Sequence, residues 1–523
     1  MFRFLSPVLL TALGLGLALP AWAAGPVFLF GSDLKGQLSN QIQNPQSPPA
    51  GLLHLKDQIL AQRAQGPTLW LDGGESLEGS PLSQELGEQS PFVALFLSLK
   101  PDVVVPGERD LAHLKLPLPW TAANLTLEGQ PLVPPYRVFE RAGKKIVVLG
   151  LIHSASSLWR TLPPGWKIEE PLESARHWVP LLRAQEHPDR LVLVLHAGRY
   201  EDRDQEAAQL LKTKPPLGAQ AIGEQVPGID LILHGHDGWL YPKGPNLAYA
   251  GTTALAGGGS LGRGMLALDW EEKGWSLRQL APRPLPLEAV KAAFPPAFLE
   301  LWSRPLGWRI RKSSKVKLAA CLNSLAALAV KQPGAFGSAL PEVYLKGSRF
   351  GLLYYAQLYD WFPFPDGVQT LALSKRDLSL LARPAAPFGR RKANPARRVF
   401  LSLSSPLDLS LDPWLVSGSD QERRYKILLS DYHLRGGSGI LPMLFLPAQP
   451  EVGGKPLRTW VSLYLQSHQP LPPSCTMLEP AGPEAYQMRP RPKQVRLAKK
   501  PKSPGKGAGK RTSTKPAESR EKS

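Results

Sequence analysis

The feature that most constrains the fold is a short apolar run that ends abruptly in polar and glycine residues, and this pattern recurs between residues 25 and 280. The runs are Val27–Asp33, Thr68–Glu75, Asp102–Asp110, Arg190–Gly198 and Ile229–Asp237. Continuous apolar runs of this length are typical of strands buried on both faces of a sheet. Helix-like stretches, Gly51–Arg63 and Leu172–Gln185, separate some of the runs. The sequence therefore predicts a layered α/β domain.

Each of these runs places a side chain able to bind a metal ion close to its carboxyl end. These side chains are Asp33, Glu75, Glu108, His196 and His236. In α/β sheets, ligands bind beyond the carboxyl ends of the strands. Two-metal hydrolysis needs a bridging carboxylate and outer His, Asp or Asn ligands around ions ~3.5–4 Å apart. The residues at this predicted rim are of the right types. His234 is a further donor, although its side chain points to the opposite face of the strand from its neighbours.

The start of the chain has the pattern of an export signal. Arg3 precedes an apolar run from Val8 to Leu19, and Ala21-Trp22-Ala23 matches the small-x-small pattern of a cleavage site. We therefore predict a signal peptide over residues 1–23 and a periplasmic or secreted mature protein, with an uncleaved anchor as the alternative. The mature chain contains no apolar stretch long enough to predict a transmembrane helix.

The length of 523 residues exceeds one compact core, so we predict two folded domains. The first covers residues 25–285, a linker rich in Pro and basic residues covers 286–317, and the second domain covers 318–478. Its two cysteines, Cys321 and Cys475, form either one disulfide or two buried free thiols.

The last residues, 479–523, are predicted to be a disordered basic tail. From Arg489 onward they hold thirteen basic and two acidic residues, which is more than half of the net charge of +19. Few large apolar residues are present, so the segment cannot form a core. The tail is either simply solvated or a tether to an anionic surface. From Arg489 onward it contains no aromatic residue for base stacking, and we find no specific nucleic-acid motif.

The polar clusters of the first domain resemble five motifs of one family. They are Asp33–Leu38 for D-x-H-G-x-L, Asp72–Glu75 with Gly79–Ser83 for D-x-G-D and G-S-P-L-S, Gly107–Asp110 for G-N-H-[DE], His196 after a buried strand, and Gly235–Gly238 for G-H-x-H. The family is the 5′-nucleotidase branch of the calcineurin-like metallophosphoesterases. The resemblance implies an αββα sandwich domain followed by an α+β C-terminal substrate domain.

The second domain carries further matches to the same family. Pro363–Asp366 is similar to P-F-x-N, and Asp431–Gly439 is similar to the later aromatic and glycine-rich motif. The resemblance implies that Phe364 and Tyr432 clamp a nucleobase and that Asp366 also binds the substrate. Arg349 stands where the family has a phosphate-side arginine, with a solvated loop charge as the alternative.

The resemblance also shows where this chain departs from the family. One family ion takes positions that here hold Asp33, Lys35, Glu75 and Gly238. Charged lysine and glycine supply no ligand, so we expect this first site to be empty. We hypothesise that the Lys35 ammonium lies near the position of the ion and pairs with Asp33 or Glu75.

The second family ion takes positions that here hold Glu75, Glu108, His196 and His236, all of which offer donors. We expect either one divalent ion, Zn, Mn or Fe, or none, because Glu75 is one methylene longer than the family's Asp.

Arg109 replaces the catalytic His of the family and Ala112 replaces its Asp partner. Arg109 can bind a phosphate, but it cannot act as a general acid at neutral pH. As an alternative, Arg109 and Lys35 neutralise carboxylates that have lost their ion. The predicted function is an exported phosphoesterase for nucleotides or related compounds with weakened or lost catalysis. The alternatives are a non-catalytic periplasmic protein that binds a nucleotide or other small ligand, and a sulfur-compound hydrolase.

Overall fold

The structure is a computed structural model, and it describes the first domain more completely than the second. The described residues are 25–154, 156, 162–200, 218–242, 246–271, 274–313, scattered residues from 318 to 329, 335–341, 351–362, 368–374, 399–403, 424–430, 457–467, 469–471 and 475–487. The predicted signal peptide and the basic tail from residue 488 onward lie outside this set. No helix among the described residues combines the length and the apolar character that crossing a membrane requires.

One sheet of the first domain has five strands in the order β15-β14-β1-β2-β3. Their bounds are β1 (Val27–Gly31), β2 (Thr68–Asp72), β3 (Val103–Val104), β14 (Met265–Glu271) and β15 (Gly274–Leu280). Strands β1, β2 and β3 run parallel, while β14 pairs antiparallel with β1. The three parallel strands therefore deliver their carboxyl ends to one edge.

The other sheet has seven strands, in the order β11-β13-β10-β9-β7-β6 with β12 paired to β13. Their bounds are β6 (Tyr136–Arg141), β7 (Lys144–Ile152), β9 (Arg190–His196), β10 (Leu231–His234), β11 (Leu240–Tyr241), β12 (Ala248–Ala250) and β13 (Thr253–Gly258). Strands β7, β9, β10 and β13 are parallel neighbours. A small separate sheet holds β4 (Leu125–Leu127), β5 (Gln130–Pro131) and β8 (Trp166–Ile168).

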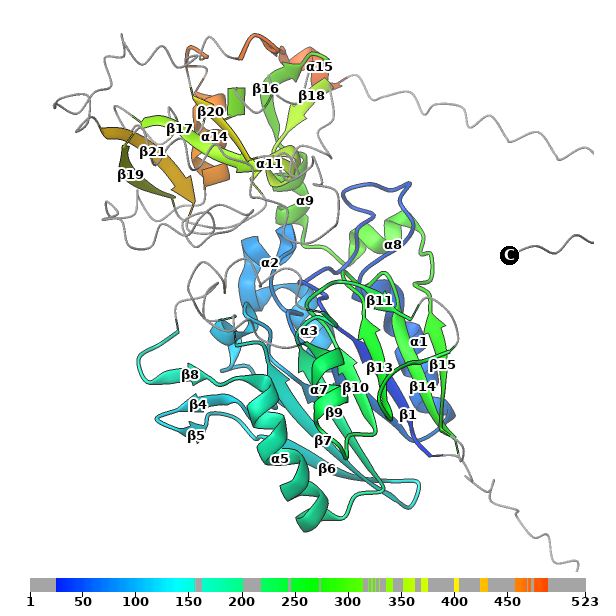
Figure 1. The fold of residues 1–523 in the computed structure, drawn as a ribbon. Coiled ribbons are helices and arrows are strands. Elements are labelled where there is room, and N and C mark those ends of the chain that lie inside the picture. Colours follow the sequence, from blue (N-terminus) through cyan, green and yellow to red (C-terminus); the bar gives the residue numbers. More distant parts are fainter. Residues whose placement is uncertain are drawn as a thin grey trace, which may run out of the picture.

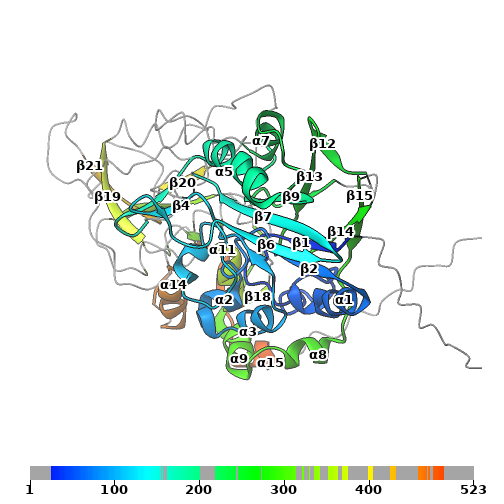
Figure 2. The ribbon, with the colours of Figure 1, turned by 90° about the horizontal axis from the view of Figure 1, so that it is seen from below.

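The two large sheets face each other and helices cover their outer faces (Figures 1 and 2). The core between the sheets includes the apolar residues Phe30, Leu71, Val148, Val194 and Leu233, all of which are fully buried. A second core lies under α1 (Leu52–Gln65) and α3 (Pro91–Ser98), and a third under α5 (Pro171–Glu186) and α7 (Ala219–Gln225). The predicted αββα sandwich is confirmed.

All the apolar runs that predicted buried strands form strands, and each strand ends where the polar cluster begins. Both predicted helices also form, as α1 and α5, although Pro180 lies inside α5. The match follows from burial: all five residues of β2 are buried, so the run is apolar throughout rather than alternating.

The described part of the second domain contains two small sheets and an apolar core of its own. One sheet has β16 (Pro305–Ile310), β18 (Gly351–Tyr354) and β22 (Leu478–Pro480), and the other has β17 (Ala335–Pro341), β19 (Val368–Ser374), β20 (Val399–Leu403) and β21 (Arg424–Ser430). The core gathers around α11 (Ala356–Trp361) and α14 (Leu457–Gln466). A disulfide joins Cys321 and Cys475 in this core, which settles the alternative that the sequence left open.

The predicted linker over 286–317 contains more regular structure than its composition indicated. It holds α8 (Leu287–Ala292), α9 (Pro296–Ser303) and β16, which pairs with β18 and β22 of the second domain. Pro296 stands in the first turn of α9, where the missing N–H costs nothing. At the other end, β22 and α15 (Pro483–Gln487) extend structure beyond the predicted boundary at Leu478.

The two domains make contact through α2 (Pro81–Leu86), which follows the second motif of the first domain. Glu85 on α2 accepts a hydrogen bond from the Tyr359 hydroxyl and lies 3.7 Å from Nε of Arg458. The Arg458 guanidinium lies 4.4 Å from the centre of the Tyr359 ring. Arg458 is 1% exposed, so this charged contact is shielded from water.

Candidate metal centre and its substituted half

Five strand ends meet at one rim and carry the predicted site residues. Asp33 follows β1, Glu75 follows β2, Glu108 follows β3, and His196 and His236 belong to the ends of β9 and β10. Polar groups from both sheets therefore converge, as the position of the predicted clusters indicated.

The backbone at this rim is unusual in its conformation. Asp33, Lys35, Glu75 and His236 all have left-handed backbones, with φ of 54°, 53°, 53° and 69°. Such conformations cost non-glycine residues roughly 1–3 kcal/mol each and are concentrated at functional sites. The strain indicates that the rim is built for side-chain placement rather than for stability.

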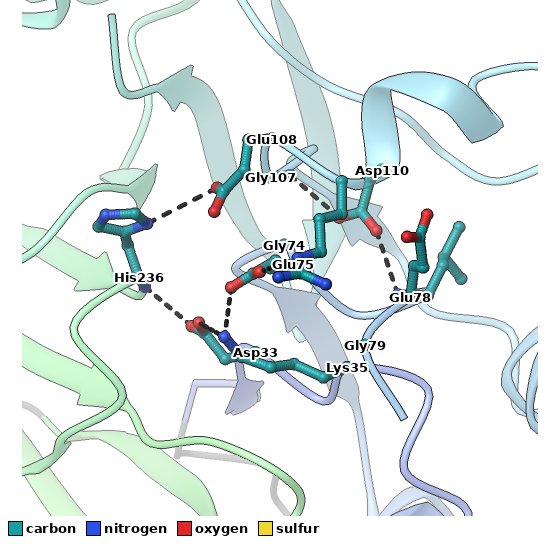
Figure 3. Close-up of polar contacts among 12 residues, drawn as sticks. Asp33, Lys35, Gly74, Glu75, Glu78, Gly79, Gly107, Glu108, Asp110 and His236 are labelled. Carbon is teal, nitrogen blue, oxygen red and sulfur yellow. Dashed lines mark hydrogen bonds and ion pairs between the residues drawn. The ribbon is translucent and has the colours of Figure 1, made fainter. Parts of the chain in front are cut away.

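One half of the rim brings together Glu108, His196 and His236 (Figure 3 shows Glu108 and His236). Each offers one donor atom, and these atoms all lie within 4.8 Å of one another. Glu108 Oε2 lies 3.0 Å from His196 Nε2 and 3.6 Å from His236 Nδ1. We call this group the Glu–His–His cluster.

A backbone carbonyl orients His196. Its Nδ1 lies 2.6 Å from the oxygen of Gly73, and because a carbonyl only accepts, Nδ1 carries the proton. Nε2 of the neutral ring is then an acceptor that faces another acceptor, Glu108 Oε2, at 3.0 Å. A proton or a metal ion must lie between the two atoms. A metal-ligating histidine usually donates the N–H of its other ring nitrogen to a carbonyl or carboxylate, as Nδ1 of His196 does to Gly73.

The ionisation of the Glu–His–His cluster reflects the same contact. Burial by itself lowers the pKa of His196, but the hydrogen bond and charge of Glu108 outweigh it and raise the pKa to about 8. Burial raises the pKa of Glu108, but His236 and His196 outweigh burial and hold that pKa well below its usual range. The cluster therefore carries a proton at neutral pH when no ion is bound.

The other half of the rim consists of Asp33, Lys35, Glu75 and Arg109, which we call the substituted half. Lys35 Nζ donates to Glu75 Oε2 at 2.6 Å and lies 3.6 Å from Asp33 Oδ1. Arg109 Nε lies 2.8 Å from Glu75 Oε1. Figure 3 shows Lys35 between the two carboxylates. Both oxygens of Glu75 are therefore engaged by cations of the chain itself.

The charged groups of the substituted half change one another's pKa values. Burial lowers the pKa of Lys35, but Glu75 and Asp33 outweigh burial and raise it. Burial raises the pKa of Asp33, but Lys35 and other neighbours outweigh it and lower the pKa. For Glu75, burial and the charge of Glu108 raise the pKa to about 7. Lys35 and Arg109 lower the pKa of Glu75, but their effect is smaller.

Two further carboxylates near the rim hold loops in place. Asp110 accepts hydrogen bonds from the backbone N–H of Leu77 at 3.1 Å and of Gly107 at 3.0 Å. Asp72 accepts from the Ser76 hydroxyl at 2.8 Å. Burial raises the pKa of both carboxyls, to about 7 for Asp72. These residues join the second and third motifs and position Glu75 and Glu108.

The residues fit one metal ion and do not fit two. In the Glu–His–His cluster a carboxylate oxygen and two imidazole nitrogens converge, and the facing acceptors of Glu108 and His196 need a cation or proton between them. In the substituted half, the Lys35 ammonium lies against the Asp33 and Glu75 carboxylates, and Gly238 has no side chain. Of the predicted ligands, the structure thus groups Glu108, His196 and His236, while Glu75 and Asp33 face Lys35.

Other predicted residues have different positions. Arg109 binds Glu75, which is the neutralising arrangement that the sequence left as an alternative to phosphate binding. His234 is fully buried, with Nδ1 3.7 Å from Asp237, and is not part of the cluster. Arg349, Phe364, Asp366 and Tyr432 lie outside the described residues.

The sequence reasoning missed His153. This residue directly follows β7, is 1% exposed, and its ring lies 5.4 Å from the ring of His236. The signal was available: Lys144–Ile152 is another apolar strand that ends in a polar residue, so the strand-end rule applied to it also.

Comparison with known proteins shows which proteins this chain is similar to. No family model matches the chain. A 5′-nucleotidase of Vibrio cholerae is 27% identical over 213 residues, a match that spans 37% of this chain and 37% of that protein. Among solved structures, a 5′-nucleotidase precursor from Thermus thermophilus has a TM-score of 0.60 at 15% identity and covers 85% of this chain and 96% of that one.

A third relative has a different printed activity. The sulfate thiohydrolase SoxB of Thermus thermophilus, in complex with glycerol, has a TM-score of 0.54 at 20% identity and covers 86% of this chain and 96% of that one. The chain therefore has the two-domain fold of these solved structures. The predicted resemblance to 5′-nucleotidases is confirmed.

Proposed function

We propose that this chain is an exported, 5′-nucleotidase-like phosphoesterase that binds a single divalent ion and has weakened catalysis. The observation that carries the proposal is the Glu–His–His cluster at the strand-end rim. Glu108, His196 and His236 would hold the ion, and a mixed carboxylate and imidazole set suits Zn, Mn or Fe. When bound, such an ion polarises a phosphoryl oxygen and lowers the pKa of a bound water.

The chain's own residues prepare this site in three ways. The Gly73 carbonyl fixes the Nδ1 proton of His196, so that Nε2 faces inward. The Asp33 carboxylate accepts a hydrogen bond at 2.8 Å from the backbone N–H of His236 and holds the loop that carries it. Lys35 and Arg109 keep Glu75 occupied, which leaves Glu108 as the carboxylate that faces the imidazoles.

The substitutions account for the weakened catalysis. A second ion and a catalytic imidazole each stabilise charge in the transition state, and one such group is worth roughly 10²–10³ in rate. Lys35 supplies a fixed charge instead of the ion, and Arg109 cannot donate a proton at neutral pH. The substrate class proposed from the resemblance is a nucleotide or related ester, bound by Arg349, Phe364, Asp366 and Tyr432.

A second candidate is a non-catalytic protein that binds a nucleotide or another small ligand. The observation in its favour is that Glu75, at the position of the family's bridging carboxylate, is held by two cations of the chain. A rim neutralised in this way keeps positive charge for a phosphate without the means to activate water.

Export is part of the proposal. It is supported by the signal-like sequence over residues 1–23, by the disulfide between Cys321 and Cys475, and by the Thermus thermophilus structure, which is of a precursor. Disulfides persist in oxidising compartments such as the periplasm. We also propose that the basic tail contacts an anionic surface, on the strength of its charge alone.

The deciding experiment measures metal content and turnover of a nucleoside 5′-monophosphate on the same purified sample, with and without a chelator. About one equivalent of metal with chelator-sensitive turnover supports the enzyme. Absence of both metal and turnover, with ligand-induced thermal stabilisation, supports the binding protein. The variant His196→Gln is expected to abolish metal binding, while His113→Gln, outside the cluster, serves as the matched control.

A further inference from the structure

His153 lies beside the Glu–His–His cluster without belonging to it. It follows β7, the strand next to β9, and its backbone N–H donates to the carbonyl of His196 at 3.0 Å. Its side chain is 1% exposed. This buried imidazole therefore lies at the end of a central strand, next to His196 of the Glu–His–His cluster.

The ring of His153 stacks on the ring of His236. Their centroids are 5.4 Å apart and the ring planes are inclined by only 14°. The ring of His196 also contacts His236: it lies 5.2 Å away and is inclined by 77°, an edge contact. The ring of His236 therefore contacts one nearly parallel ring and one nearly perpendicular ring.

His236 needs such support more than His196 does. His196 belongs to β9, where neighbouring strands and the Gly73 carbonyl hold it. His236 lies in a loop after β10, with a left-handed backbone at φ 69°, and its Nδ1 is 3.6 Å from Glu108. A rotation of its ring about the side-chain bonds would move this nitrogen away from Glu108.

We propose that His153 is a positioning residue that fixes the ring plane of His236 by stacking, so that His236 points its nitrogen at the ion. The proposal rests on the single-ion site proposed above. His153 is not itself a ligand in this arrangement, because the atoms that share a 4.8 Å sphere are those of Glu108, His196 and His236. A flat aromatic ring favours an offset parallel partner, which an aliphatic side chain of similar volume cannot replace.

If His153 acts by stacking, residue 153 must carry a flat ring but needs no nitrogen atom. A ring without nitrogen atoms should keep the function, whereas a side chain without a ring should lose it. His153→Phe preserves the stack, His153→Leu keeps apolar volume without a ring, and His153→Gln keeps polar atoms without a ring. His177→Leu is the matched control, because His177 also contacts an aromatic ring, Trp178 at 5.4 Å, and is exposed away from the rim.

The test titrates Co²⁺ into each metal-free protein and records the dissociation constant and the visible d–d absorption. We expect His153→Leu and His153→Gln to bind Co²⁺ roughly 10–100-fold more weakly, the usual cost of losing an outer-shell partner. Their absorption bands should also change in position or intensity. His153→Phe and His177→Leu should keep the wild-type spectrum and an affinity within about threefold.

Two results would overturn the proposal. If His153→Phe loses as much affinity as His153→Leu, a nitrogen atom of His153 is required and stacking is not its role. If His153→Leu and His153→Gln both bind like the wild type, His153 does not position His236. A variant that fails to fold, judged by circular dichroism, is replaced in this comparison by the other ringless variant.

A second readout separates this proposal from the proposed function. In metal-free protein labelled with ¹³C on histidine, the ring-current shift of the His236 ring protons reports the stack directly. It should change in His153→Leu and remain in His153→Phe. If the wild type binds no Co²⁺, the single-ion function fails. In that case, stacking of His153 on His236 is still supported if the shifts change in His153→Leu and not in His153→Phe. If the shifts do not differ in this way, the whole proposal fails.

Discussion

The two halves of the strand-end rim differ in the groups that neutralise their buried carboxylates. The substituted half holds two carboxylates, Asp33 and Glu75, and places the permanent cations Lys35 and Arg109 against them. The Glu–His–His cluster holds one carboxylate, Glu108, and two imidazoles, of which His196 has a pKa of about 8.

The difference shows two ways in which a protein can compensate buried carboxylates. Buried carboxylates cannot stay ionised without a compensating charge, so a half with two of them and no histidine needs a cation from the chain. A half with imidazoles can take up a proton when the metal is absent and release it when the metal binds. The first half has thereby become a fixed salt bridge, while the second keeps the means to exchange an ion.

The largest effect is expected from reversing the charge of Lys35, which pairs with Asp33 and Glu75. Lys35→Glu would bring a third carboxylate against Asp33 and Glu75, and breaking a buried pair costs about 3–5 kcal/mol. We expect the free energy of unfolding, measured by urea titration, to fall by that amount. Lys115→Glu, on the exposed surface, is the control. An unchanged stability in Lys35→Glu would contradict the role given to Lys35.

The next largest effect concerns the other half. Glu108→Gln removes the one carboxylate of the Glu–His–His cluster, and we expect Zn²⁺ affinity to fall roughly 100-fold or more, since even outer-shell partners are worth 10–100-fold. Isothermal titration calorimetry measures this change. Glu78→Gln is a matched control, because Glu78 is similarly buried but outside the cluster. Equal affinities in the two variants would show that the ion, if bound, lies elsewhere.

The pH dependence of stability tests the protonation of the cluster. The pKa of His196 in the metal-free folded protein is about 8, above the ordinary 6.5. Its stabilising contribution is therefore complete below pH 6.5 and is lost as the pH rises through 8, by about 2 kcal/mol. Urea titrations across this range should show the decline, and His196→Gln should flatten it. Saturating Zn²⁺ should remove the decline, because the ion requires the neutral ring.

The smallest effect is expected at Arg109. Arg109→Met leaves the Lys35 contact of Glu75 intact and removes one charged hydrogen bond, so the free energy of unfolding should fall by about 1–2 kcal/mol. Zn²⁺ affinity should stay within about threefold, because the Glu–His–His cluster does not include this residue. Arg263→Met, at an exposed position, controls for the loss of a surface charge. A large loss of Zn²⁺ affinity in Arg109→Met would show that the substituted half and the Glu–His–His cluster act as one site.

The comparison also separates what could be predicted from what could not. Strands buried on both faces are apolar throughout, so all five runs were recognisable, and the polar residue after each strand marked the rim. His153 follows the same rule but was overlooked, because it belongs to no motif of the family. The helices in the predicted linker were missed because Pro was interpreted as a breaker rather than as a first-turn residue.

The sequence by itself determined the layered fold and the chemical types at the rim, because burial and donor chemistry depend on residue identity. Only the tertiary structure decided which of those donors lie together and which are paired with lysine and arginine. It directed the two oxygens of Glu75 toward Lys35 and Arg109, grouped Glu108 with His196 and His236, and stacked His153 on His236. The reason is that an ion pair, a hydrogen bond or a ligand set depends on distances of a few ångströms between residues far apart in the chain, such as Asp33 and His236, which are 203 positions apart. Strand pairing and loop conformation fix such distances, and a list of residue types does not contain them.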